Sequence, residues 1–302
     1  MKNITIIGSA NTDMVVKTDR FPEPGETIIG GDFYMFPGGK GANQAVAAAR
    51  AGGAVQFVCA VGDDLFGKNA LAGYQKESIA IDAALVIPGE ASGVALITVN
   101  GQGENEIVVA SGTNAALSPE HLEASWGSFA ESDIFLTQLE TPLATVGFLA
   151  KRCKGEGRRL IINPAPAQPL SDAVLDGLFL ITPNETETKI LTGITVEDDA
   201  SRDQAAESLL GKGVQNVIIT LGSKGSYFKN SETAFTVESP KVKAVDTTAA
   251  GDVYNGVLSV CLAKRMGWRE SMAYASKAAA LSVTRMGAQD TAPTLTEINQ
   301  FQ

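Results

Sequence analysis

The chain has few of the residues on which several classes of active site depend. Its 302 residues include one histidine, His121, and three cysteines, Cys59, Cys153 and Cys261, which lie far apart and form no CxxC pair. We therefore expect neither a Ser-His-Asp hydrolase nor a His-ligated metal site, and no disulfide or zinc framework. The thiols instead indicate buried side chains in a reducing, cytoplasmic compartment.

Positive charge and long apolar runs are also scarce. Lys and Arg number 24 against 34 Asp and Glu, which gives a formal net charge of −10. No stripe of Lys and Arg stands out, so a nucleic-acid partner is not expected. No apolar run reaches membrane-spanning length, and the run at the N-terminus is too short for a signal peptide, so no membrane partner is expected either.

Short apolar runs alternate with amphipathic or alanine-rich stretches along most of the chain. The expected strands are Ile4–Ile7, Gln56–Val61, Ile134–Leu139, Leu160–Asn163, Phe179–Thr182 and Val217–Leu221, and the expected helices between them are Ala42–Arg50, Phe66–Glu77, Thr145–Lys154, Glu185–Leu191 and Asp203–Lys212. This alternation is typical of βαβ units and predicts a three-layer α/β sandwich, with a central, mostly parallel sheet flanked by helices. No linker, repeat or low-complexity segment appears, so residues 1–302 are expected to form a single domain.

Two regions break this rhythm, at about residues 12–38 and 91–112. The segments Met14–Lys17, Thr27–Ile29, Val94–Val99 and Glu106–Val109 alternate like exposed antiparallel strands. The last two flank Asn100–Gly103, a natural hairpin turn. Together they predict a small antiparallel sheet that stands off the main sheet as a lid over the strand ends.

The most informative segment is Asp246-Thr247-Thr248-Ala249-Ala250-Gly251-Asp252, which precedes an apolar helical stretch. Its small residues let backbone N–H groups point outward at a helix N-terminus, where the helix dipole also favours an anion. Asp252 at the edge of such a site suits phosphoryl transfer, because its carboxylate can take a proton from an attacking hydroxyl. A capped helix start with a tight turn explains this segment about equally well by itself.

Two polar segments lie near the N-terminus. Gly8–Asp13 follows the first strand, where open α/β sheets bind ligands, and Asn11 and Asp13 match the vicinal hydroxyls of a polyol. An Asx turn is an equally good interpretation. Pro37–Gln44 is a glycine-rich loop that opens a helix without P-loop or GxGxxG spacing, and Lys40 and Asn43 bring polar groups into it. A flexible turn is the alternative there.

Two further segments follow later strands. Asn184 and Glu187 could hold water on magnesium, although acidic residues are also expected in any first helical turn. Thr220–Gly225 is either a nucleotide-binding loop or a hairpin turn, and by itself the turn is favoured.

These segments resemble the motifs of the ribokinase-like (PfkB) family of carbohydrate kinases. The two family motifs are Gly38-Gly39-Lys40-Gly41-Ala42-Asn43 and Asp246–Asp252. The resemblance covers nearly the whole chain, and it extends through Gly8–Asp13, Val94–Asn105, Gln138–Glu140, Asn163–Pro166, Thr182–Glu187, Thr220–Gly225 and Thr284–Gln289.

The resemblance implies a role for each matching position. Asp252 is expected to be the catalytic base, and Ala249, Ala250 and Gly251 the anion hole. The positions implied for the sugar are Asn11, Asp13, Gly39, Lys40, Asn43, Glu140 and Asp252. Those implied for the nucleotide are Asn184, Glu187, Thr220, Gly222, Ser223, Gly225, Gly251 and Ser276, with Glu187 reaching magnesium through water. Those implied for a monovalent cation, usually potassium, are Asp246, Thr248, Ser282, Arg285, Gly287 and Thr291. Ser276 and Lys277 depart from members that place a histidine near the adenine.

The implied activity is ATP-dependent phosphorylation of D-ribose at its primary 5-hydroxyl, with Mg²⁺ and K⁺ as cofactors and a homodimer formed through the lid strands. Other sugar or nucleoside kinases of the family, acting on deoxyribose, fructose or adenosine, are alternatives, and so is a sugar sensor without turnover. The Asn11-x-Asp13 pair favours a ribose-like diol over a deoxysugar.

Overall fold

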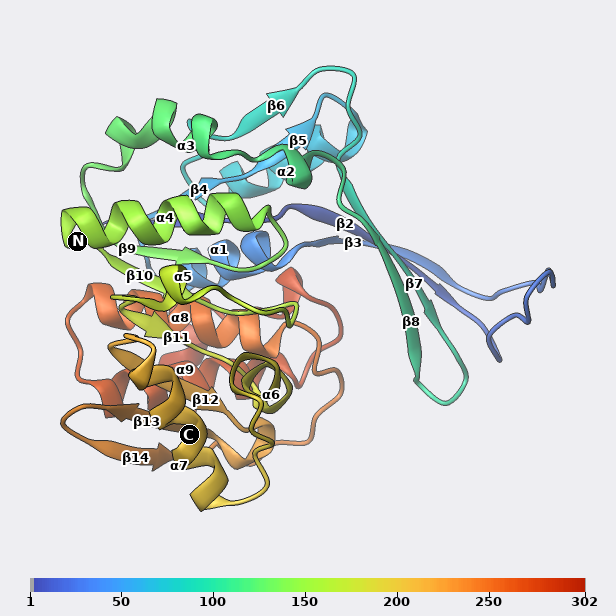
Figure 1. The fold of residues 1–302 in the computed structure, drawn as a ribbon. Coiled ribbons are helices and arrows are strands. Elements are labelled where there is room, and N and C mark those ends of the chain that lie inside the picture. Colours follow the sequence, from blue (N-terminus) through green and yellow to red (C-terminus); the bar gives the residue numbers. More distant parts are fainter. Residues whose placement is uncertain (1–2, 302) are drawn as a thin grey trace.

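The apolar runs that predict strands form the parallel strands of a central sheet. The computed structural model describes residues 3–301. Its main sheet has eight strands in the order β14-β13-β12-β11-β10-β9-β1-β4 (Figure 1). All pairings from β4 to β12 are parallel, and β13 and β14 extend the sheet antiparallel. The strands are β1 (Asn3–Ile7), β4 (Val55–Val58), β9 (Ser132–Thr137), β10 (Arg159–Ile162), β11 (Leu180–Ile181), β12 (Asn216–Thr220), β13 (Ser226–Asn230) and β14 (Ala234–Val237).

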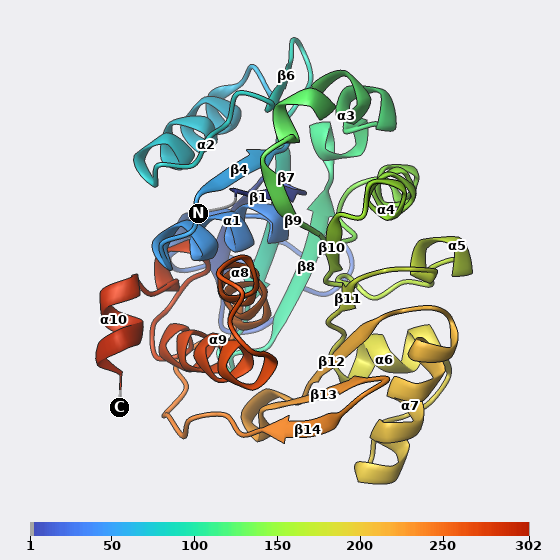
Figure 2. The ribbon, with the colours of Figure 1, turned by 90° about the vertical axis from the view of Figure 1, so that its left-hand side faces the viewer.

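Helices cover both faces of this sheet, which confirms the predicted three-layer α/β architecture (Figure 2). One face carries α1 (Lys40–Arg50), α2 (Leu65–Lys76), α8 (Ala250–Ala263), α9 (Trp268–Ser282) and α10 (Leu295–Gln300). The other carries α3 (Pro119–Ser125), α4 (Leu143–Glu156), α5 (Asp172–Leu175), α6 (Glu185–Thr192) and α7 (Asp199–Gly211).

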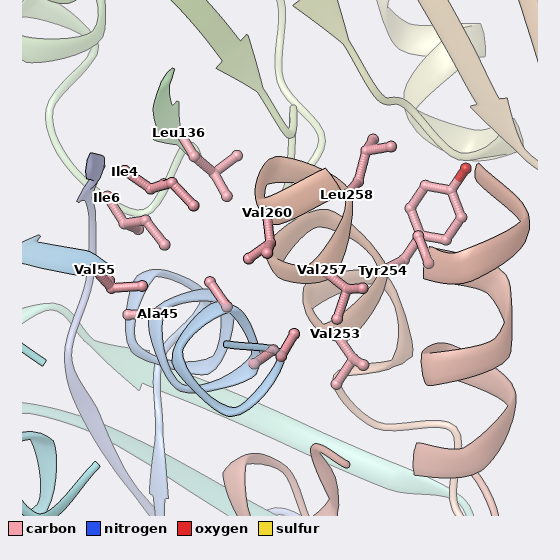
Figure 3. Close-up of a cluster of buried hydrophobic side chains, with 14 of the residues drawn as sticks. Ile4, Ile6, Ala45, Val55, Leu136, Val253, Tyr254, Val257, Leu258 and Val260 are labelled. Carbon is pink, nitrogen blue, oxygen red and sulfur yellow. The ribbon is translucent and has the colours of Figure 1, made fainter. Parts of the chain in front are cut away.

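Alternating strand residues divide the core into two layers. Ile4 and Ile6 face α1 and α8, whereas Ile7 faces the opposite helices. Figure 3 shows the first layer, in which sheet residues meet side chains from these two helices. The helices cross closely at Gly256 of α8, where an added Cβ would lie 2.5 Å from the carbonyl oxygen of Gln44. Only glycine allows this approach, so α1 and α8 bring their N-terminal turns to the same edge of the sheet.

A second, smaller sheet extends from the main body, where the sequence predicts a lid (Figure 1). It contains β2 (Asn11–Lys17), β3 (Phe33–Gly38), β7 (Gly93–Val99) and β8 (Asn105–Ala110) in the order β3-β2-β7-β8. Two antiparallel pairs, β2–β3 and β7–β8, are joined by a parallel pairing of β2 with β7.

Two predicted strands are wrong in detail. Thr27–Ile29 is not a strand, because β2 is already paired along Asn11–Val16 by Phe33–Gly38 and offers no further partner. The expected strand Gln56–Val61 is divided between β4 and β5 (Ala60–Gly62). After Ile7 the chain leaves the sheet for the lid, so β4 loses its neighbour and β5 pairs with β6 (Leu85–Ile87) instead.

Other features agree with the sequence. Cys59, Cys153 and Cys261 are free and buried. Among residues 3–301, no helix is both long and apolar enough to cross a membrane.

Candidate active site

Asp252 lies in the first turn of α8 and is only 5% exposed. Its Oδ1 accepts a hydrogen bond from Gln44 Nε2 (2.9 Å) and its Oδ2 accepts one from Asn43 Nδ2 (3.0 Å). Both donors come from α1. The close crossing of α1 and α8 therefore supplies two neutral donors to a buried carboxylate.

The turn before α8 has an unusual backbone. Ala249, the N-cap residue, adopts φ 59° and ψ 8°, a left-handed conformation that costs about 1 kcal/mol or more for a residue with a Cβ. This turn presents Gly251 and its neighbours at the helix N-terminus, where partial positive charge gathers. The amide of Ala250 makes a long bond of 3.3 Å to the carbonyl of Thr247. Ala249, Ala250 and Gly251 thus lie together at a helix end suited to an anion.

The glycine-rich loop packs against the end of β1. Gly39 caps α1 with φ 89°, and a Cβ there would lie 2.8 Å from the backbone nitrogen of Asn11. A Cβ on Gly41 would lie 2.6 Å from the carbonyl carbon of Gly8. The glycines are therefore needed for close backbone approach, and the loop packs tightly against the residues that follow β1.

Lys40 stands among several carboxylates. The attraction of Asp252, and then of Glu140, Glu187 and Asp13, raises the pKa of Lys40 despite its burial. Burial raises the pKa of Asp252, while Lys40, Asn43 and Gln44 oppose that shift and Glu140 adds to it. One cation thus faces more acidic groups than it can neutralise.

Asp13 and Asn11 line the start of the lid. Burial, followed by repulsion from Glu140 and Asp252, raises the pKa of Asp13 to about 6, with Lys40 acting in the opposite direction. The Asp13 carboxylate lies over Gly38, where a Cβ would be 2.3 Å from its oxygens. Asn11 is buried, and its Oδ1 accepts from Asn114 Nδ2 at 2.7 Å. That bond fixes which way the Asn11 amide faces.

Glu140 joins the same group from the loop after β9. Its Oε2 accepts from Ser9 Oγ (2.5 Å) and from the amide of Lys40 (3.0 Å). The predicted sugar positions Asn11, Asp13, Gly39, Lys40, Asn43, Glu140 and Asp252 thus converge on one place, although they come from distant parts of the chain.

The segments predicted for the nucleotide lie at neighbouring strand ends. Asn184 forms a parallel bridge with Thr220, and the amide of Thr220 donates to the carbonyl of Pro183 at 2.9 Å. Asn184 also caps α6 through a reciprocal bond pattern with Glu187. Burial raises the pKa of Glu187, opposed by the Asn184 amide and by Lys40.

Thr220–Gly225 forms the turn between β12 and β13. Gly222 and Gly225 adopt φ 56° and φ 100°, and Ser223 is exposed between them. The hairpin-turn interpretation is therefore correct for the backbone, and this turn opens beside Asn184.

The loop around Asp246 is tied to the segment after α9. Asp246 Oδ1 accepts from the amide of Thr248 (2.9 Å), and Oδ2 accepts from the amide of Gly287 (3.0 Å). Burial acts to raise the pKa of Asp246, but these bonds keep it below its usual value. A cavity of about 790 Å³ lies between this loop and the lid, and its lining includes Asp13, Asp246, Thr248 and Gly287.

Other predicted residues lie less directly at this site. Ser276 is buried in α9, and the adjacent Lys277 donates to the carbonyl of Phe301. Ser282 and Thr291 are buried near the Asp246 loop, with hydroxyls bonded to Ala279 and Ala288 carbonyls. The Arg285 side chain pairs with Glu297 on α10. His121 caps α3, remote from the loops, as expected.

Several polar residues at the site were not anticipated. Ser9, Gln44, Asn114 and Gln138 each hold a predicted residue or one of its partners. A glutamine in an alanine-rich helix gives no signal in the sequence, since its partners are far away along the chain. The segments Gly8–Asp13, Pro37–Gln44 and Gln138–Glu140 did include Ser9, Gln44 and Gln138, but the sequence indicates no role for any of these three.

The donor set favours hard cations held largely by ligands from outside the protein. Within residues 3–301, no group of three or more His, Cys, Asp and Glu side chains is placed to hold a metal ion. Single carboxylates such as Glu187 and Asp246 fit ions that keep water, phosphate or carbonyl oxygens as their other ligands.

Comparisons with known proteins point to one family. The family described as "pfkB family carbohydrate kinase" matches residues 1–295. A ribokinase from Haemophilus influenzae is 42% identical over 300 residues, covering 99% of this chain and 98% of that enzyme. A deoxyribokinase from Salmonella typhimurium is 35% identical, with 99% and 98% coverage.

Solved structures give the same picture. A ribokinase from Thermotoga maritima superposes with a TM-score of 0.92 at 38% identity, covering 100% of this chain and 99% of that one. A ribokinase from Arabidopsis thaliana, complexed with ribose and ATP, has a TM-score of 0.92 at 30% identity, with 99% and 98% coverage.

The crowding of carboxylates predicts that Asp13→Asn stabilises the ligand-free protein. The pKa of Asp13 is about 6 in the folded chain and near 3.8 when unfolded. The folded state therefore binds more protons between these values, and stability falls as pH rises through that window. At pH 7.5 the variant should gain roughly 1–3 kcal/mol in the free energy of unfolding, and below pH 4 it should gain nothing.

Thermal or urea unfolding across this pH range measures the difference. Asp19→Asn, which removes an exposed carboxylate beyond the end of β2, should leave stability unchanged. Equal stability of wild type and Asp13→Asn at pH 7.5 would contradict the crowding.

Proposed function

The chain belongs to the pfkB family of carbohydrate kinases, and we propose that the site around Asp252 transfers the γ-phosphoryl group of ATP to D-ribose. The acceptor is the primary 5-hydroxyl, and the products are ribose 5-phosphate and ADP. The observation that carries the proposal is the position of Asp252. Its buried carboxylate lies at a helix N-terminus, between the polyol-binding side chains and the loops that end the later strands.

Asp252 acts as the general base. Burial raises the pKa of its carboxyl, which brings the group closer to the working pH of a base, while Lys40 opposes that rise. It accepts the proton of the 5-hydroxyl as that oxygen attacks the γ-phosphorus in line with the leaving ADP oxygen. Amides at Ala249, Ala250 and Gly251 stabilise the charge on the transferring group.

The sugar lies between the lid and the N-terminus of α1. Asn11, Asp13, Asn43 and Glu140 bind its hydroxyls, with Gly39 and Lys40 completing the site. Asn43 supports this assignment, because its buried Oδ1 has no partner among the described residues and can accept from a hydroxyl. The lid strands exclude water, which would otherwise hydrolyse ATP.

ATP lies along the ends of β11 and β12. Asn184, Glu187, Thr220, Gly222, Ser223 and Gly225 bind it, with Gly251 at the phosphates and Ser276 toward the base. Glu187 would hold Mg²⁺ through water, and the ion when bound neutralises phosphate charge.

A monovalent cation site surrounds Asp246. Asp246, Thr248, Ser282, Arg285, Gly287 and Thr291 would hold K⁺, the last four largely through backbone carbonyls. Such an ion compensates Asp246 and stiffens the turn that carries the anion hole. The bonds from Asp246 to Thr248 and Gly287 support this assignment because they join both halves of the site.

The protein is further proposed to act in the cytoplasm as a homodimer through its lid strands. The lid exposes several large apolar side chains, namely Phe33, Met35, Leu96, Ile107, Val108 and Val109. Pairing two lids would cover this surface.

D-ribose should be the preferred acceptor. A sugar lacking the 2-hydroxyl would leave a buried polar group such as Asp13 unpaired, at a cost of about 1–3 kcal/mol. Ribose should therefore exceed 2-deoxyribose at least about tenfold in kcat/KM. A coupled ADP-release assay over pentoses, hexoses and nucleosides measures this ratio. Equal efficiency on both sugars would contradict the ribokinase proposal. It would favour the deoxyribokinase alternative, an activity carried by the 35% identical Salmonella typhimurium enzyme.

Asp252→Asn should lower kcat by about a hundredfold or more, because the amide cannot take the proton. Its affinity for ATP and ribose, measured by calorimetry, should change little. Asp172→Asn, at an exposed position in α5, serves as the control. If Asp252→Asn keeps more than half of the wild-type kcat, the residue is not the base.

Potassium should raise kcat more than sodium does, because the larger ion suits a cage of carbonyls without tight dehydration. Asp246→Ala should abolish that dependence with the fold intact, and Asp290→Ala, an exposed carboxylate in the same C-terminal segment, should retain it. Identical rates in potassium and tetramethylammonium would leave Asp246 a plain structural residue.

A further inference from the structure

Gln44 holds the carboxylate of Asp252 with an amide whose two N–H donors are both in use. Its Nε2 donates to Asp252 Oδ1 (2.9 Å) and to Asn163 Oδ1 (3.0 Å). Its Oε1 accepts from Gln138 Nε2 (2.5 Å). The side chain is completely buried. An amide nitrogen has only two hydrogens to give, so this group is saturated on its donor side.

The orientation of this amide follows from the chemistry of its neighbours. An ionised carboxylate accepts hydrogen bonds and donates none, so Nε2 of Gln44 must face Asp252. Oε1 then faces Gln138, which must present its own Nε2. The other atom of that amide, Gln138 Oε1, is buried without a hydrogen-bond partner among the described residues.

Gln138 is itself held in place by shape. Its Oε1 packs against Gly8, where an added Cβ would lie 2.0 Å away. Gln138 follows β9 and Gly8 follows β1, two adjacent strands of the sheet. The sheet therefore fixes Gln138, Gln138 fixes Gln44, and Gln44 fixes one oxygen of Asp252.

We propose that Gln44, locked by Gln138, is a positioning residue that aims the carboxylate of Asp252 at the acceptor hydroxyl and keeps it ionised. This inference rests on the proposed function, in which Asp252 is the base. Asn43 holds the other carboxylate oxygen at 3.0 Å, but it also faces the sugar site. Gln44 is completely buried, and among the residues assigned to the sugar it bonds only Asp252 in the described structure.

Several charged groups act on the ionisation of Asp252, so a group that favours its charged form has a purpose here. Lys40 of α1 favours its ionised form, whereas Glu140 of the β9–α4 loop opposes it. The charges of Asp13 on the lid and Glu187 on α6 also interact with Asp252. Donation from Gln44 adds to the effect of Lys40, because a hydrogen bond to the charged form of an acid lowers its pKa.

A purely structural role predicts something different. Gln44 also links α1 to Asn163 after β10, so a variant could lose stability through that link alone. Loss of the hydrogen bond between Gln44 and Asn163 would lower the free energy of unfolding without changing the pH at which Asp252 titrates. The acid limb of the kcat–pH profile therefore separates the two roles.

The test is Gln44→Met, which keeps the length of the side chain and removes its donor. With ribose and ATP, kcat should fall at least about tenfold while both KM values stay within about threefold, and the acid limb should move up by about one pH unit. Gln138→Met should shift the limb in the same direction by less, because it frees the Gln44 amide without removing it. The two effects should not add in the double variant.

Asn216→Leu is the matched control. Asn216 is a buried amide at the start of β12, and its Nδ2 donates to the carbonyl of Phe179 at 2.8 Å. That variant should lose stability but keep the wild-type acid limb.

An acid limb that stays in place in both Gln44→Met and Gln138→Met, with an active wild type, would overturn the positioning role alone. A wild type that releases no ADP with any sugar would overturn the proposed function itself. If Gln44→Met does not fold, Gln138→Met decides the question, since it leaves Gln44 in the helix.

Discussion

The close crossing of α1 and α8 is the constraint on which the site depends. Gly256 lets the two helices approach until a Cβ would lie 2.5 Å from the carbonyl of Gln44. Because of that approach, Asn43 and Gln44 reach Asp252, and Lys40 faces it at the same edge of the sheet. The packing of α1 against α8, part of the core in Figure 3, therefore also sets the position of Asp252, the proposed base.

Charge is the second constraint, because repulsion among carboxylates lowers the stability of the ligand-free protein. Asp13, Glu140, Glu187 and Asp252 interact around one lysine in a chain that is already acidic overall. Under the proposed function, sugar hydroxyls would donate hydrogen bonds to these carboxylates and cations would offset their charge, so the arrangement would favour the ligand-bound protein. The four carboxylates would then lower the free energy of unfolding in favour of ligand binding, a trade-off that is common at functional sites.

Much of this could be predicted from the sequence, because the motifs lie where strands end and helices begin. Asn11, Glu140 and Asn184 come after the parallel strands β1, β9 and β11, whose carboxyl ends lie at one edge of the sheet. Lys40 and Asp252 lie in the first turns of helices α1 and α8. Gln44 and Gln138 lie in segments that the sequence singled out, but their contact could not be predicted, because helix packing brings together residues 94 positions apart. The division of Gln56–Val61 into two strands likewise depends on where β1 leaves the sheet, which no local pattern records. The roles of the sugar, nucleotide and cation residues rest on family resemblance and stay predictions.

The most direct test of the central claim is a crystal structure with ribose and a non-hydrolysable ATP analogue. The account predicts the 5-hydroxyl oxygen within hydrogen-bonding distance of the Asp252 carboxylate, with the γ-phosphate at the N-terminus of α8 and Gln44 still bonded to Asp252. A sugar whose 5-hydroxyl points away from Asp252, with the terminal phosphate remote from residues 249–251, would contradict it.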